Sequence, residues 1–161
     1  MASVRSTIVE LCVFKRTKKG PLYLVLKRSS TERLYPDIWQ IITGKLKERE
    51  KAAIAVLREL KEETGLLPKR LWVVPAVDSF FDPVGDAVEL CPLFAAEVEA
   101  TSVPTLSSEH REFVWAGMKQ ARKLLVWPGH KDAVKTVHDY IVAGREAGRL
   151  TELEPNAQKG K

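Results

Sequence analysis

The sequence predicts a single-domain protein of the α+β class or an α/β/α sandwich. Its 161 residues are about the size of one domain, and neither an internal repeat nor a linker divides them. Most segments have the composition of strands, with one helical segment in the middle and another near the end. We therefore expect one domain over residues 1–148. Residues 149–161 are polar and aperiodic, and we expect them to form a flexible C-terminal tail.

Six segments are rich in β-branched and aromatic residues and are predicted to be strands: residues 7–14, 22–26, 38–43, 71–81, 87–98 and 110–115. Helices are predicted over residues 50–64, 119–125 and 130–143. In the first helix Ala53, Leu57 and Leu60 fall at i, i+4 and i+7 and form one apolar stripe. Gly65 stands where a glycine would end that helix.

Composition excludes several classes of protein. With 45% hydrophobic and 29% charged residues, the chain fits a folded protein rather than a disordered one. No apolar run approaches the roughly 18 residues needed to span a bilayer, and no secretory cleavage pattern follows the first residues. Cys12 and Cys91 lie inside apolar runs without a partner motif, so we expect buried free thiols and a cytoplasmic protein.

The net charge of +5 favours anionic ligands such as nucleotide phosphates. The densest basic cluster, residues 15–19, precedes a Gly-Pro turn and contains no aromatic residue. We interpret it as a solvated hairpin turn and expect no specific nucleic-acid partner and no membrane partner. The sequence leaves open whether the protein is a monomer or a homodimer.

Three carboxylates gather on one side of the first predicted helix. Glu59, Glu62 and Glu63 fall within an arc of roughly 100°, where their charges repel. A hard divalent cation would neutralise such a group, and oxygen ligands suit Mg²⁺, with Mn²⁺ as a substitute. Arg58 is placed to reach Glu62 one turn later and Glu50 before the helix, and a guanidinium fork would hold these carboxylates in fixed orientation.

The spacing of these residues resembles the Nudix signature, G-x5-E-x7-R-E-U-x-E-E-x-G-U, in which U is a bulky aliphatic residue. All of its defined positions are matched, by Gly44, Glu50, Arg58, Glu59, Leu60, Glu62, Glu63, Gly65 and Leu66. The resemblance extends over roughly residues 4–145. It implies the Nudix fold, an α/β/α sandwich around a mixed β-sheet, and hydrolysis of a nucleoside diphosphate linked to another moiety.

The resemblance also implies residue roles. Glu59, Glu62 and Glu63 would be metal ligands, assisted by the backbone carbonyl of Gly44, while Glu50 and Arg58 would hold the loop and the helix in register. Lys47 and Arg49 replace the acidic residue and the glycine of many relatives, which makes this loop more basic.

Two flanking motifs bear on the substrate. Trp39-Gln40-Ile41-Ile42-Thr43-Gly44 resembles the W-Q-x-x-T-G of bacterial dihydroneopterin triphosphate pyrophosphatases, which also act on dATP. Residues 109–115 resemble an E-H-x-x-F-x-W element found in that group and in diadenosine tetraphosphate hydrolases. The resemblance implies that Glu109 is a further metal ligand or the general base, with Glu112 as an alternative, and that His110 orients the late loop.

The predicted function is metal-dependent hydrolysis of a nucleoside or pterin triphosphate to a monophosphate and pyrophosphate. The alternatives are hydrolysis of a dinucleoside polyphosphate such as diadenosine tetraphosphate and a weakly catalytic nucleotide-sensing domain. The catalytic set comprises Glu62, Glu63, Glu109 and Arg58. The substrate-binding set comprises Arg28, Trp39, Gln40 and Phe113. We interpret His130 and His138 as a helix-cap and a surface residue.

Overall fold

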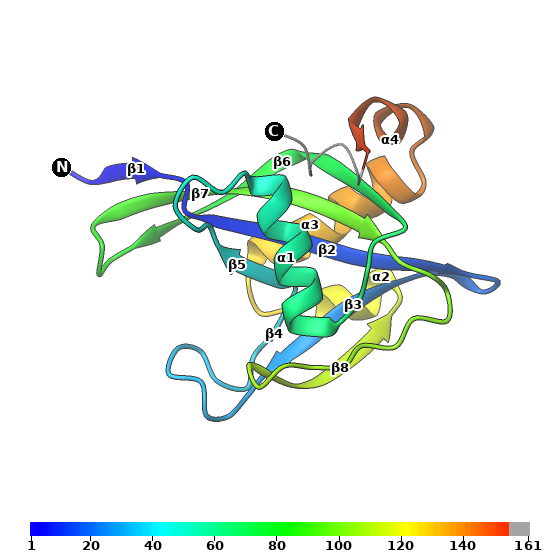
Figure 1. Ribbon diagram of the computed structural model, residues 1–161, viewed down its shortest axis with the longest axis horizontal. Helices are drawn as coiled ribbons and strands as arrows, with labels where there is room; N and C mark the ends of the chain where they lie inside the picture. Colours follow the sequence, from blue (N-terminus) through cyan, green and yellow to red (C-terminus); the bar gives the residue numbers. More distant parts are fainter. Residues whose placement is uncertain (155–161) are drawn as a thin grey trace.

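A computed structural model describes residues 1–154 of the chain (Figure 1). Nine strands form one sheet within these residues. The strands are β1 (Ser3–Arg5), β2 (Ile8–Thr17), β3 (Gly20–Arg28), β4 (Trp39–Gln40), β5 (Ile42–Lys45), β6 (Arg70–Asp82), β7 (Ala87–Glu97), β8 (His110–Ala116) and β9 (Glu152–Leu153). The helices are α1 (Ala52–Thr64), α2 (Met118–Leu124), α3 (Pro128–Thr136) and α4 (Arg145–Thr151), with a π-helical turn, η1 (Val137–Val142), directly after α3.

The sheet is mixed, as expected. Its main path runs β4-β3-β2-β7-β6-β9, with β5 pairing β2, β8 pairing β3 and β1 pairing β7. The β2–β7 and β1–β7 pairs are parallel and the remaining pairs are antiparallel. Figure 1 shows α1 crossing the near face of the sheet while α2 and α3 lie behind it, so the α/β/α sandwich is confirmed.

Two hydrophobic cores fill the sandwich, one on each face of the sheet. Under α1, Val9, Leu11 and Leu26 pack with Val56 and Leu60 of the helix. On the other face, a second core joins the sheet to α2, α3 and η1; its large members are Phe14, Tyr23, Trp72, Leu93, Val134 and Ile141. Successive residues of a strand therefore point to different cores.

Helix α1 ends where its sequence predicts. Gly65 has φ 68° and donates its backbone N–H to the carbonyl of Lys61, at 2.9 Å. This left-handed turn is one that glycine adopts without steric cost. The buried stripe is turned slightly from the predicted one: Val56 and Leu60 are buried, whereas Ala53 and Leu57 are only half-buried.

The predicted tail differs from the structure over its first residues. Arg149 lies in α4, and Glu152 and Leu153 form β9, which pairs with Leu71 and Trp72 of β6. Two hydrogen bonds from Arg70 to Glu152, at 2.8 and 2.7 Å, fix this strand. Short segments like these lack the periodicity that reveals longer ones. Residues 155–161 of the predicted tail lie outside the described part of the chain.

The N-terminal strand is attached through a buried charge. Arg5 donates from Nε to Glu89 at 2.6 Å and from Nη2 to Asp82 at 2.5 Å. The Glu89 side chain has no solvent exposure, and the backbone N–H and hydroxyl of Thr7 also donate to it. These contacts hold β1 against β7.

Candidate active site

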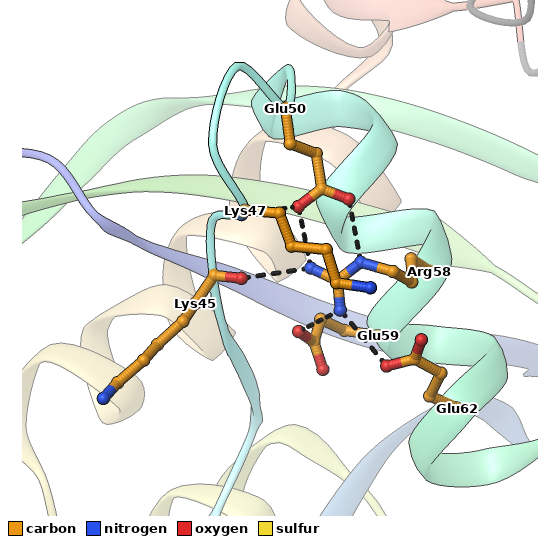
Figure 2. Close-up of polar contacts among 6 residues, drawn as sticks. All are labelled: Lys45, Lys47, Glu50, Arg58, Glu59 and Glu62. Atoms are coloured by element: carbon orange, nitrogen blue, oxygen red, sulfur yellow. Dashed lines mark hydrogen bonds and ion pairs between the residues drawn. The ribbon is translucent and has the colours of Figure 1, made fainter.

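The loop between β5 and α1 is held by one guanidinium (Figure 2). Arg58 donates from Nε and Nη2 to the two oxygens of Glu50, both at 2.8 Å, and from Nη2 to the carbonyl of Lys45 at 3.0 Å. Glu50 also accepts the backbone N–H of Lys47 at 2.9 Å. The hydrogen bonds from Arg58 hold the pKa of Glu50 at about 2, well below its ordinary range. The loop and the helix are therefore fixed relative to each other.

The remaining nitrogen of the fork points to the carboxylates of α1. Arg58 Nη1 lies 2.6 Å from Glu59 Oε1 and 3.1 Å from Glu62 Oε2 (Figure 2). The side chain of Glu62 is about half exposed, at 55%, while that of Glu59 is only 13% exposed. One arginine thus orients three carboxylates that would otherwise repel one another.

Gly44 makes room for one of these carboxylates. A Cβ atom at this position would lie 2.2 Å from Cγ and 2.5 Å from Oε1 of Glu59. Only glycine allows Glu59 to lie directly against the β5 backbone.

Glu63 lies on the buried side of α1. It is 2% exposed, and its Oε2 has no hydrogen-bond partner within the described residues. Burial raises its pKa to about 9, and the charges of Glu109 and Glu59 contribute to the shift. An unpaired buried carboxylate beside two others is costly unless a cation approaches it.

The late loop brings a fourth carboxylate and an arginine to the same place. The carbonyl of Glu109 accepts the backbone N–H of Ser29 at 2.9 Å, so Glu109 lies beside the end of β3, where Arg28 is located. Burial raises the pKa of Glu109, and the charges of Glu32 and Glu59 raise it further, while Arg28 lowers it. Arg28 donates to the carbonyl of Leu34 at 3.0 Å and to Glu32 at 3.2 Å.

The structure distinguishes Glu109 from its alternative. Glu112 pairs with Lys27, whereas the next pair along, Phe113 and Leu26, contacts the core under α1. Glu112 therefore points to the opposite face of the sheet, where its side chain is 50% exposed and lies 3.5 Å from the Lys27 ammonium.

Gln40 differs from its predicted role. It is 5% exposed, and its side-chain nitrogen lies 3.1 Å from Nε2 of His110, so its amide serves the protein interior rather than a substrate. Burial and the charge of Arg28 lower the pKa of His110 to about 4, which keeps the ring neutral. His110 Nδ1 lies 3.8 Å from Glu63 Oε2, and Gln40 therefore orients the ring that faces this carboxylate.

The two aromatic residues predicted to bind substrate lie on different faces of the sheet. Phe113 packs against the core under α1, on the carboxylate side. Trp39 packs against the opposite core, with the Lys27 ammonium 5.5 Å from its ring centre. The two rings cannot flank one base, and the structure places Trp39 away from the carboxylates, which corrects that prediction.

The sequence reasoning missed Glu32, which pairs with Arg28 and lies near Glu109. Its i, i+4 spacing from Arg28 was visible, but residues 29–37 have no periodicity that would place both side chains together. It also missed that His130, interpreted as a helix cap, is buried and that His138, interpreted as a surface residue, is half-buried. His130 is 3% exposed, and His138 Nδ1 lies 2.8 Å from the hydroxyl of Tyr23.

The donor set fits a hard divalent cation. Its members are carboxylates, and one of them has a buried oxygen that lacks a hydrogen-bond partner among the described residues. Oxygen ligands of this kind suit Mg²⁺ and Mn²⁺.

Comparison with known proteins shows the family of this chain. The family described as the NUDIX domain matches residues 7–138, and the chain therefore belongs to the Nudix family. The matched residues include the signature loop and helix, residues 44–66. No helix within residues 1–154 has the length and apolar character needed to cross a membrane.

Solved structures share the fold at low sequence identity. A NUDIX hydrolase from Listeria monocytogenes is 24% identical, with a TM-score of 0.72, over 86% of this chain and 96% of that one. A C. elegans Ap4A hydrolase is 17% identical, with a TM-score of 0.71, over 86% and 99%. The E. coli dihydroneopterin triphosphate pyrophosphohydrolase is 20% identical, with a TM-score of 0.68, over 89% and 99%.

One curated relative, an octanoyltransferase from Myxococcus xanthus, is 34% identical over 104 residues. The match covers 60% of this chain but only 28% of that protein. The chain therefore spans only about a quarter of the length of this relative.

Proposed function

We propose that this Nudix protein hydrolyses a nucleoside or pterin triphosphate to a monophosphate and pyrophosphate, with Mg²⁺ as cofactor. The observation that carries the proposal is the convergence of Glu59, Glu63 and Glu109 beside Arg28, because polyphosphate hydrolysis needs both a cation site and a donor to the phosphate.

Glu59, Glu62, Glu63, Glu109 and the carbonyl of Gly44 would hold the cation. When bound, Mg²⁺ supplies charge neutralisation for the phosphate groups and lowers the pKa of water. Arg28 donates to phosphate oxygens near the carboxylates. One carboxylate among Glu109, Glu62 and Glu63 accepts the proton of the attacking water. Arg58 acts as a positioning residue, because its fork fixes Glu59 and Glu62.

Phe113 is the aromatic residue that supports substrate binding on this face. The free, buried thiols of Cys12 and Cys91 support a reducing compartment, and we place the protein in the cytoplasm.

A dinucleoside polyphosphate is the second candidate substrate. The E-H-x-x-F-x-W element supports it, since Glu109, His110 and Phe113 all lie on or beside the carboxylate side of the sheet. A weakly catalytic nucleotide sensor is the third reading, and the complete carboxylate set argues against it.

Product analysis separates these functions. The protein would be incubated with Mg²⁺ and, in turn, dihydroneopterin triphosphate, dATP or diadenosine tetraphosphate, and the products separated by chromatography. We expect pyrophosphate and a monophosphate from the first two. Faster release of ATP and AMP from diadenosine tetraphosphate would favour the second candidate, and binding without turnover the third.

Isosteric variants test the metal ligands. Glu62→Gln and Glu63→Gln should each lower kcat by about 10²-fold or more while the circular dichroism spectrum stays unchanged. Full activity in both variants would refute their assignment as ligands.

A further inference from the structure

A second group of metal-ligating side chains lies on the face of the sheet opposite α1. It consists of Glu10 on β2, Asp78 on β6 and His130 on α3, and one ligand atom from each lies within 4.8 Å of the others. Figure 1 shows α1 in front of the sheet and α3 behind it, so this group is separated from the signature carboxylates by the sheet itself.

The group contains a buried carboxylate oxygen without a hydrogen-bond partner among the described residues. Glu10 is 2% exposed, and its Oε2 makes no hydrogen bond within the described residues. Its Oε1 lies 3.3 Å from Nε2 of His130, which is 3% exposed. Burial raises the pKa of Glu10; the hydrogen bond and the charge of His130 oppose this shift, and the nearby charge of Asp78 adds to it. One imidazole does not compensate two neighbouring carboxylates, so the group lacks positive charge.

The backbone is shaped to bring Asp78 into this group. A Cβ atom at Gly129 would lie only 2.0 Å from Oδ2 of Asp78, so glycine at the second position of α3 lets the carboxylate lie against the helix. The pairing of β6 with β7 shifts register between Val73 and Val77, directly before Asp78.

The donors match a transition metal better than Mg²⁺. Imidazole nitrogen suits zinc and its neighbours, whereas Mg²⁺ and Ca²⁺ favour oxygen alone. Ligand atoms about 2.1 Å from a tetrahedral zinc ion are about 3.4 Å apart, close to the 3.3 Å between Glu10 and His130. A cavity of about 110 Å³, lined in part by Asp78, Gly129 and Asp132, adjoins the group. It has room for a water molecule as a fourth ligand.

We propose that Glu10, Asp78 and His130 form a second divalent-metal site, for a zinc-class ion, on the face of the sheet opposite the signature helix. Its ion joins β2, β6 and α3 and stabilises their packing. It takes no part in hydrolysis.

Zinc titration tests the site by itself. The triple variant Glu59→Gln/Glu62→Gln/Glu63→Gln removes the signature carboxylates, and after dialysis against a chelator it would be titrated calorimetrically with Zn²⁺. We expect one ion to bind and to raise Tm. Adding Asp78→Asn should weaken binding by at least about tenfold. The matched control Asp132→Asn, an exposed acid lining the same cavity, should leave it unchanged.

A second readout follows the proposed imidazole ligand directly. The chain has three histidines, so side-chain nitrogen NMR of the triple variant can follow each ring. We expect stoichiometric zinc to shift the His130 nitrogens, assigned through His130→Gln, and to leave His110 unchanged. The proposal is overturned if no ring shifts, or if Asp78→Asn and Asp132→Asn bind zinc equally; Glu10 and His130 would then be an ion pair alone.

Discussion

The side chain of Glu59 occupies the space that a Cβ atom would fill at Gly44. The hypothetical Cβ lies 2.2 Å from Glu59 Cγ and 2.3 Å from Cδ. The position of the Glu59 carboxylate on α1 therefore depends on glycine at position 44 of β5.

Gly44→Ala should displace the Glu59 carboxylate and leave the fold in place, because the atoms in contact belong to the end of a side chain. A displacement of about 1 Å at a reacting centre lowers rates by about 10²-fold. We expect a fall in kcat of that order at saturating Mg²⁺. Gly117→Ala is the matched control, since a Cβ there meets nothing within 4 Å. Equal activity in both variants would show that the Gly44 contact has no catalytic role.

Arg58→Lys keeps the positive charge but removes the fork. A lysine cannot bond both oxygens of Glu50, the Lys45 carbonyl and Glu59 together. Since hydrogen bonds to charged groups contribute about 1.5–3 kcal/mol, we expect the free energy of unfolding to fall by about that much. Urea denaturation measures it, with the exposed Arg145→Lys as control. An unchanged midpoint for Arg58→Lys would contradict the importance of the fork.

Metal-free stability should depend on pH through Glu63. Its folded pKa of about 9 lies above the ordinary value of 4.5, so folding takes up a proton between these limits. The contribution of Glu63 to the free energy of unfolding is therefore full below about pH 4.5. It is lost as the pH rises toward 9, by at most about 1.4 kcal/mol per pH unit. Glu63→Gln lacks this loss, and its stability advantage in chelator should grow from pH 5 to pH 8.

The comparison is made by urea denaturation of both proteins at each pH. Added Mg²⁺ should narrow the advantage at pH 8, because the cation binds only the native carboxylate. A difference between the proteins that stays constant with pH would argue against the raised pKa.

Glu109→Gln and Glu112→Gln make the same isosteric change at two nearby positions, one directly before β8 and one within it. Glu109 lies near Glu63 and Arg28, whereas Glu112 points to the other face. We expect Glu109→Gln to lower kcat by about 10²–10⁴-fold, the range for general acid–base groups, and Glu112→Gln to have almost no effect. Steady-state kinetics with the preferred substrate decide it. A larger loss for Glu112→Gln would reverse the assignment.

The segments with strong local signals were predicted well. The first helix and its glycine stop follow from periodicity and from the conformational freedom of Gly65, and both depend on neighbouring residues alone. The mixed sheet was predicted from the resemblance rather than from periodicity, because strand pairing joins residues far apart in the chain.

The burial of Glu63 was within reach of the sequence. Val56, Leu60 and Glu63 are spaced i, i+4 and i+7, so the glutamate continues the stripe that faces the core. The predicted stripe, which passes through Ala53 and Leu57, is rotated by about one residue from the buried one and leaves Glu63 at its edge. Small rotations of a helix thus decide whether a carboxylate meets water or the interior.

The environments of Trp39, Gln40 and His130 were beyond the sequence. Each depends on which face of a strand or helix meets a distant element: Gln40 on His110 of β8, Trp39 on the core behind the sheet, and His130 on Glu10 of β2. One-residue changes of strand register reverse such faces, and local patterns do not fix them.

The ion pairs of Arg5 with Asp82 and Glu89 give β1 a structural role beyond its strand pairing. A shorter form of the protein that began after this residue would leave Glu89 enclosed by β1's former neighbours with only the Thr7 donors to compensate its charge. We expect the uncompensated charge to destabilise the β6–β7 pair near Glu89. Truncations or extensions are therefore best made before Ser3, where the described chain is exposed and makes no ion pair comparable to those of Arg5.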